Sequence, residues 1–183
     1  PFFTKKIKIE IINKLNEKLD LNYLSIGQKI YLYENKESLI EKIILPKNLD
    51  TDLVIYIDSD KVSVNIEKVK IIKEINALEF YISTSLYEDG INAGVPLSIL
   101  SDSIRLYSFD IDFQRDIKKN TKFEVLYETL INSKRKNIEY GNIQYINLKI
   151  EKKDLEYFIF ETEEGYFDYF NREGKNIKKS LLK

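Results

Sequence analysis

The 183-residue chain contains no histidine and no cysteine. Without imidazole there is no Ser-His or Cys-His nucleophile activation and no histidine zinc site. Without thiols there are no disulfides, thiolate nucleophiles or cysteine metal ligands, although this absence leaves the compartment open. Most hydrolase mechanisms are therefore excluded, and we predict that this chain alone is not an enzyme and holds no catalytic, cofactor-binding or metal-binding residues.

An excess of charge of one sign is also missing. The chain has 29 Lys and Arg against 30 Asp and Glu, a formal net charge of -1. This balance argues against nucleic acid or an anionic membrane surface as a partner. The longest apolar run, Leu53 to Ile57, is far shorter than the roughly 18 residues of a spanning helix. A composition of 43% hydrophobic and 32% charged residues is typical of a globular protein.

Methionine is absent as well, and the first residue is Pro1. We therefore expect an internal segment of a longer protein. The lysine-rich stretch from Lys175 to Lys183 has no clear end signal, which is typical of a linker to a further part.

The first half of the sequence predicts one helix followed by antiparallel strands. Apolar residues recur at helical spacing from Lys5 to Leu19, although β-branched Ile leaves a strand over Lys6 to Ile12 as the alternative. Turn residues then separate short alternating or apolar runs. The predicted strands are 29–33, 39–45, 53–57 and 62–66.

The second half predicts two short helices and then a β-meander or small barrel. Ser83 to Ser85 offer N-caps, Gly94 suits a C′ position and Pro96 suits a first turn, so helices are expected over Ser85 to Ala93 and Pro96 to Tyr107. From Phe123 onward, runs rich in Tyr, Phe, Ile and Val alternate with polar loops. The predicted strands are 123–130, 138–150, 155–161 and 166–170.

Three acidic residues form the densest candidate site. On an extended segment Asp110 and Asp112 would share one face, as a carboxylate pair or metal site requires, with Asp116 close by. The segment also contains Ile111, Phe113 and Ile117. We favour a structural role, in which the apolar residues dock and Asp116 pairs with Arg115 or caps a backbone donor.

Other motifs also have simpler structural explanations. Asp58-Ser59-Asp60 lacks the later Gly and Glu of an EF-hand loop, so it predicts a turn. Ser133-Lys134-Arg135-Lys136 matches Ser-x-x-Lys, which is catalytic only at the start of a buried helix, so we expect a polar hairpin tip. The 13 Tyr and 10 Phe could stack on sugars, but core and cross-strand packing is their first expected role.

Several motifs, in order, resemble one family. They are Ser85-Leu86-Tyr87-Glu88-Asp89-Gly90-Ile91-Asn92-Ala93-Gly94-Val95-Pro96, the run from Phe109 to Lys119, Lys122 to Glu128, Gly165 to Asp168, Gly174-Lys175 and Lys178 to Lys183. Together they look like the region before the catalytic domain in Gram-negative murein endopeptidases of the lysostaphin/LytM-type zinc metallopeptidase family. Leu21 to Leu32, which includes Leu24 to Ile30, is similar to the end of the LysM-like module that opens many of these proteins.

Two departures are visible. Phe109 stands where the family usually has Trp, and Asn120-Thr121 replaces a Gly-Asp turn, which Asn tolerates because it adopts left-handed conformations. The family's zinc ligands lie in His-x-x-x-Asp and His-x-His motifs, which do not occur in this sequence. The resemblance thus implies zinc only in a catalytic domain beyond Lys183.

Together these observations predict an α+β fold that is predominantly antiparallel β. Residues 1–75 would form a small LysM-like α/β module with a β extension. Residues 76–183 would form a meander or barrel-like domain with a two-helix insert. The resemblance implies a non-catalytic regulatory or positioning region of a periplasmic or envelope zinc endopeptidase, with its own peptidase domain and peptidoglycan as partners. A stand-alone wall-binding or adaptor module is the alternative.

Overall fold

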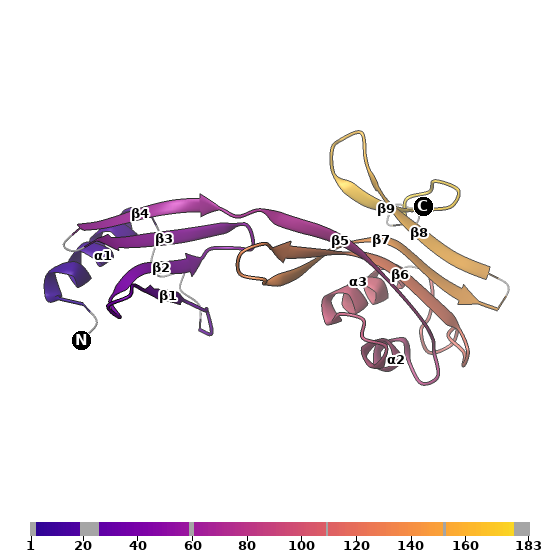
Figure 1. The fold of residues 1–183 in the computed structure, drawn as a ribbon. Coiled ribbons are helices and arrows are strands. Elements are labelled where there is room, and N and C mark those ends of the chain that lie inside the picture. Colours follow the sequence, from indigo (N-terminus) through magenta and orange to yellow (C-terminus); the bar gives the residue numbers. More distant parts are fainter. Residues whose placement is uncertain (1–2, 19–25, 59–60, 109, 152, 178–183) are drawn as a thin grey trace. The chain divides into compact units, whose positions relative to one another are not determined.

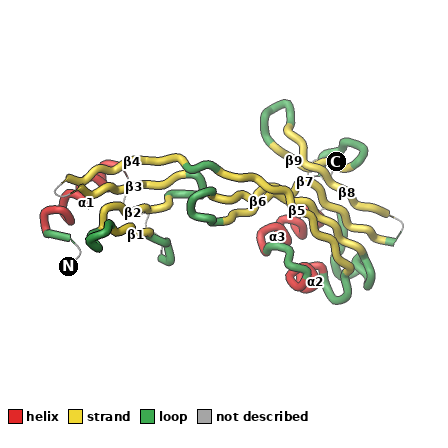
Figure 2. The backbone as a smooth tube through the Cα atoms, in the orientation of Figure 1, coloured by secondary structure: helices red, strands yellow, loops and turns green. Residues whose placement is uncertain are grey.

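The structure is a computed structural model of the 183-residue chain, and it describes residues 3–18, 26–58, 61–108, 110–151 and 153–177 (Figure 1). Among the described residues antiparallel strands predominate, with three helices, in an α+β fold with a two-helix insert (Figure 2). The chain divides into two compact units. Unit 1 comprises residues 1–72 and 132–137, and unit 2 comprises residues 73–131 and 138–183. None of the described helices is long and apolar enough to span a membrane.

The described part of unit 1 is one helix on a four-stranded antiparallel sheet. The sheet has the order β1-β2-β3-β4, so each strand pairs with its neighbour in sequence. Its elements are α1 (Lys5–Lys18), β1 (Tyr31–Glu34), β2 (Ile40–Pro46), β3 (Thr51–Asp58) and β4 (Lys61–Lys68). The predicted helix is confirmed over Lys5–Lys18, and Leu19 lies outside the described residues. The alternative strand over Lys6 to Ile12 is wrong.

The helix in unit 1 covers one face of the sheet. Ile7 and Leu15 of α1 pack with alternate residues of the strands, including Leu53 and Ile55, in one apolar cluster. The backbone of Val62 on β4 is contacted by two helix side chains: the Val62 N–H donates to Glu10 at 3.3 Å, and Lys14 donates to its carbonyl. Because β4 is the last strand in the sheet order, these contacts occupy polar groups that an edge strand leaves unpaired.

Unit 2 is a five-stranded meander with the sheet order β5-β6-β7-β8-β9. Its elements are β5 (Ile71–Tyr81), α2 (Leu86–Asn92), α3 (Leu97–Tyr107), β6 (Lys122–Asn132), β7 (Ile138–Ile150), β8 (Lys153–Glu161) and β9 (Phe167–Asn171). The meander is therefore confirmed. Strand β5 was not anticipated, because Lys73-Glu74 and Asn76-Ala77 interrupt its apolar alternation.

The two helices of unit 2 lie on the same face of its sheet (Figure 1). The Ser85 side chain caps α2 by accepting from the Glu88 N–H at 3.0 Å, and Gly94 after the helix has φ +85, as the sequence predicts. Pro96 is the N-cap of α3. Asn120 adopts φ 70, the left-handed conformation expected of it.

The core of unit 2 lies between this helix pair and the sheet. The docking expected of Ile111, Phe113 and Ile117 is confirmed, because all three pack against this core. Its buried residues include Leu86, Val95 and Leu100 from the helix region. Tyr107 is fully buried and its hydroxyl donates to the Leu155 carbonyl at 3.0 Å. Burial raises the pKa of Tyr107 well above its usual value.

The first residues of the expected linker are folded. Ile177 is 3% exposed in the core of unit 2, and Asn176 forms a β-bridge with Phe170. Residues 175–177 are therefore part of the folded unit. The apolar side chain of Ile177 is buried in the core although lysines lie on both sides of it in the sequence. Residues 178–183, which the linker prediction also includes, lie outside the described residues.

Candidate functional site

The acidic residues are distributed over separate structural contacts. The carboxylate of Asp116 accepts from the Asp112 N–H at 2.9 Å and pairs with the Arg115 Nε at 3.0 Å. Asp112 Oδ1 in turn accepts from the Gln114 N–H at 3.0 Å. The hydrogen bond from Arg115 lowers the pKa of Asp116. The structural role predicted for Asp116, as ion-pair partner and backbone cap, is confirmed.

Asp110 has a different partner, the hydroxyl of Tyr157 on β8. Burial first, and then the hydrogen bond to Asp110, raises the pKa of Tyr157 well above its usual value. The phenol therefore stays protonated near neutral pH and serves as a donor rather than a base. Within the described ranges, no group of three or more acidic side chains is placed to hold a metal ion.

Two further sequence motifs have the following outcomes. Ser133-Lys134-Arg135-Lys136 forms the turn between β6 and β7, so the predicted hairpin tip is confirmed. Asp58 ends β3, and Ser59-Asp60 lies outside the described residues.

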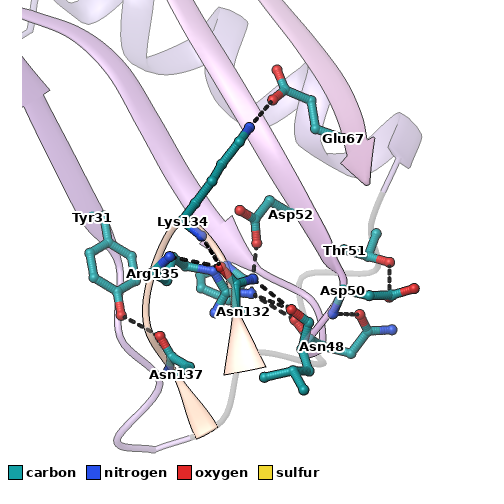
Figure 3. A network of polar contacts seen from close by, with 12 residues as sticks. Tyr31, Asn48, Asp50, Thr51, Asp52, Glu67, Asn132, Lys134, Arg135 and Asn137 are labelled. Carbon is teal, nitrogen blue, oxygen red and sulfur yellow. Dashed lines mark hydrogen bonds and ion pairs between the residues drawn. The ribbon is translucent and has the colours of Figure 1, made fainter. Parts of the chain in front are cut away.

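The hairpin tip 132–137 is the most elaborate polar site of unit 1 (Figure 3). Asn132 organises it: its Oδ1 accepts from the N–H groups of Lys134 and Arg135 at 2.9 and 2.7 Å, and its Nδ2 donates to the Leu49 carbonyl at 2.7 Å. Asn favours such turns because its side chain can bond to nearby backbone. Asn132 is fully buried, so these bonds replace those that water would make.

The tip lies over the sheet face that α1 does not cover. The register of the strands puts Asp52 of β3, Glu67 of β4 and Tyr31 of β1 on that face. Lys134 reaches Glu67 at 3.6 Å, and the Tyr31 hydroxyl lies 3.4 Å from the Asn137 Oδ1. The tip therefore makes contacts across the sheet from β1 to β4.

Arg135 and Asp52 form a buried ion pair at the centre of this contact. Their Nη2 and Oδ1 atoms are 2.9 Å apart, with the side chains 5% and 3% exposed. The same Nη2 donates to the carbonyls of Asn48 and Leu49 at 2.9 and 3.2 Å. Asp52 Oδ1 and Arg135 Nε lack a hydrogen-bond partner among the described residues. The 2.9 Å contact is therefore an ion pair that lacks hydrogen-bond alignment. Because both side chains are buried, loss of either one leaves an uncompensated buried charge.

Sequence reasoning missed this site. A lone Arg in a polar turn suggests solvent exposure, and 83 residues separate it from Asp52 along the chain. Asn132 before the turn is the one local signal, since a buried Asn at a strand end requires partners.

Unit 2 has a hollow of about 610 Å³ near the ends of β8 and β9. Acidic and basic side chains line it together, and Arg172 pairs with Glu156 at 2.7 Å. Tyr157 and Asp110 also border it, but they are bonded to each other. The described lining offers no activated nucleophile beside a base.

Solved structures share this fold. A zinc-containing peptidase from Vibrio cholerae matches with a TM-score of 0.62 and 18% identity, over 95% of this chain and 52% of that one. Helicobacter pylori Csd3 matches with a TM-score of 0.61 and 17% identity, over 79% of this chain and 38% of that one. These similarities establish the fold.

One curated relative extends the comparison to sequence. The peptidoglycan DD-endopeptidase ShyC of Vibrio cholerae serotype O1 is 24% identical over 174 residues, which cover 95% of this chain and 38% of ShyC. No protein-family model matches the chain. The chain is therefore homologous to part of a peptidoglycan endopeptidase, spanning less than half of that relative.

Proposed function

We propose that this chain is a non-catalytic region of a zinc-dependent peptidoglycan endopeptidase of the cell envelope. It would position the peptidase and restrict access to its substrate groove. The observation that carries the proposal is the match to ShyC, which includes 95% of this chain but only 38% of the relative. The sequence has no histidine or cysteine to bind zinc in the usual way, so the metal would be held by a separate domain.

That separate domain would be this region's principal partner. Covalent attachment would keep the region at high effective concentration beside the peptidase, so it could occupy the groove without strong intrinsic affinity. Large substrates need more of a groove than short ones. Occupation would therefore restrict cleavage of whole sacculi more than cleavage of short cross-link peptides.

A deletion within the parent protein tests this role. Because Ile177 belongs to the core of unit 2, the deletion should include everything up to that residue. We expect cleavage of intact sacculi to rise about fivefold and cleavage of a short cross-link peptide to change little, at equal zinc occupancy. Lower sacculus cleavage with unchanged peptide cleavage would contradict restriction and indicate substrate targeting.

The second candidate is a stand-alone wall-binding or adaptor module. Its support is the resemblance of Leu24 to Ile30 to a LysM-like segment, which would grip glycan. The gene sequence after Lys183 separates the two candidates. His-x-x-x-Asp and His-x-His motifs within about 150 residues, roughly one domain, support the endopeptidase, whereas a stop codon supports the module.

A further inference from the structure

A row of apolar side chains crosses the second sheet on the face away from its helices. Leu126 on β6 lies opposite Tyr145 on β7, Tyr145 opposite Phe158 on β8, and Phe158 opposite Phe170 on β9. Directly paired residues share one face of a sheet. Val125 precedes Leu126 in β6 and Ile146 follows Tyr145 in β7, and both point into the helix-covered core. Adjacent residues of a strand point to opposite faces. The row is thus on the outer face.

Phe160 lies two residues after Phe158 on β8, so it is on the same outer face and extends the row. The rings of this extended row contact one another. Ring centroids are 5.1 Å apart for Tyr145 and Phe158, 6.5 Å for Phe158 and Phe160, and 6.2 Å for Phe160 and Phe170. Phe160 is 58% exposed. Single exposed apolar residues are normal on a protein surface, but a connected series of rings is typical of a binding surface.

The backbone is irregular where Tyr145 enters the row. Tyr127 pairs with Ile143 while Leu126 pairs with Tyr145, so Gln144 has no partner on β6. An extra residue of this kind is a β-bulge, which redirects the side chains beside it. A hollow of about 340 Å³ lies at this end of the row, lined by Ala77, Leu126 and Tyr145 among others.

Polar groups run beside the rings, and hydrogen bonds and ion pairs hold the acidic ones in place. Glu124 accepts from Asn147 at 3.0 Å and from Lys122 at 2.6 Å. Glu156 accepts from the Tyr145 hydroxyl at 3.1 Å and pairs with Arg172 at 2.7 Å. Lys122 also pairs with Glu79 at 2.8 Å, and Asp168, opposite Phe160, accepts from Asn176 at 2.7 Å. The strip therefore carries more carboxylates than cations and offers mainly hydrogen-bond acceptors.

We propose that the outer face of this sheet, centred on Tyr145, Phe158 and Phe160, binds a neutral glycan strand. A sugar ring has an apolar C–H face that stacks on aromatic rings and hydroxyl groups at its edge that bond to paired carboxylates, amides and guanidinium groups. Because carboxylate acceptors predominate on this strip, it suits a neutral ligand with many hydroxyl donors and repels a polyanion. The inference rests on the proposed function for the source of the glycan, which is peptidoglycan.

The chain itself can be tested with a neutral oligosaccharide. The probe is the β-1,4-linked hexamer of N-acetylglucosamine, titrated by calorimetry into the 183-residue protein and two variants. Phe160→Ala removes an exposed ring of the row. Phe167→Ala is the matched control, because Phe167 is equally exposed, at 57%. Its neighbour Asp168 lies opposite Phe160 on the outer face, so Phe167 points to the other face.

We expect Phe160→Ala to weaken hexamer binding about fivefold and Phe167→Ala to change it by less than about twofold. Both variants should keep the circular dichroism spectrum of the parent chain. Equal effects of the two substitutions, or no binding by the unaltered protein up to about 1 mM hexamer, would overturn the proposal.

Two further measurements distinguish other occupants. Binding to sacculi should survive enzymatic removal of the stem peptides, and binding that depends on those peptides would overturn a glycan site. Sedimentation should show no dimer that Phe160→Ala abolishes, since such a dimer would assign the face to a second copy of the chain. Failure of glycan binding would leave the deletion experiment on the parent endopeptidase unaffected, so the two proposals fail separately.

Discussion

The two units bury different kinds of groups. In unit 2 the cluster between the helix pair and the sheet is apolar, with Leu100, Phe123 and Leu148 at 0% exposure. Unit 1 has an apolar cluster under α1, but its other sheet face buries the ion pair of Asp52 and Arg135. Burial of apolar area favours folding wherever it occurs, whereas a buried ion pair offsets its own desolvation only when both partners remain.

This difference has a consequence for folding specificity. The apolar core of unit 2 depends mainly on the volume and pattern of its side chains. The tip of unit 1 depends on particular atoms, since Arg135, Asn132 and the carbonyl of Leu49 must meet in one geometry. We therefore expect large effects from volume changes in unit 2 and from charge changes in unit 1.

The largest effect should come from Leu100→Ala in unit 2. This side chain is fully buried in the core beside Gly90, where an added Cβ would meet it at 2.8 Å. The cavity and lost burial should lower the free energy of unfolding by about 2–5 kcal/mol, measured by urea denaturation. Leu97→Ala, in the same helix but 55% exposed, is the control and should cost under about 0.5 kcal/mol. Equal costs for the two substitutions would show that the helix pair does not pack on the sheet.

The next effect should come from Arg135→Ala in unit 1. It leaves Asp52 buried and unpaired, so we expect a loss of about 3 kcal/mol in urea denaturation. Lys134→Ala removes the neighbouring ion pair with Glu67. Because the Lys134 side chain is 59% exposed, this change should cost under about 0.5 kcal/mol. A double variant with Asp52→Ala should cost less than the sum of the single changes, because it leaves no unpaired charge. Additive costs would argue against a coupled pair.

A smaller effect should depend on pH. The N–H groups of Thr84, Ser83 and Ser85 donate to the carboxylate of Asp89 at 2.8, 2.7 and 3.1 Å, which lowers its pKa. A pKa that is lower in the folded state gives stability that is present above the ordinary value of 3.8 and is lost as pH falls through the folded value.

Asp89→Asn should therefore cost about 1 kcal/mol at pH 7 and less at low pH, in urea melts across that range. Asp102→Asn is the control, since Asp102 makes only a surface pair with Arg105 at 2.9 Å and should show little effect. A cost for Asp89→Asn that is constant down to low pH would rule out the charged carboxylate as its cause.

Local signals in the sequence predicted much of the fold. Ser85, Gly94 and Pro96 marked the helix pair through capping and backbone preferences that act within a few residues. Apolar periodicity found α1 and most strands. Strand β5 escaped because its solvent-facing charges and its small Ala77 hide the alternation.

The hairpin-tip contact and the aromatic row were harder to predict from the sequence. The contact between Arg135 and Asp52 joins residues far apart in the chain, and neither has a local feature that indicates burial. The ring series requires the register of four strands and a bulge before Tyr145, so composition indicated only an abundance of aromatics. Both features depend on which residues of distant strands lie opposite each other. The conformational preferences of single residues do not specify that pairing.

The central claim is that this chain serves an endopeptidase without performing its chemistry, and metal content together with turnover tests it most directly. The purified 183-residue protein would be dialysed against zinc-containing and then metal-free buffer, analysed for bound metal, and assayed for clearing of sacculi. The account predicts no stoichiometric zinc and no clearing, because the sequence has neither His nor Cys as a zinc ligand. One tightly held zinc ion per chain, or clearing that a chelator abolishes, would contradict it.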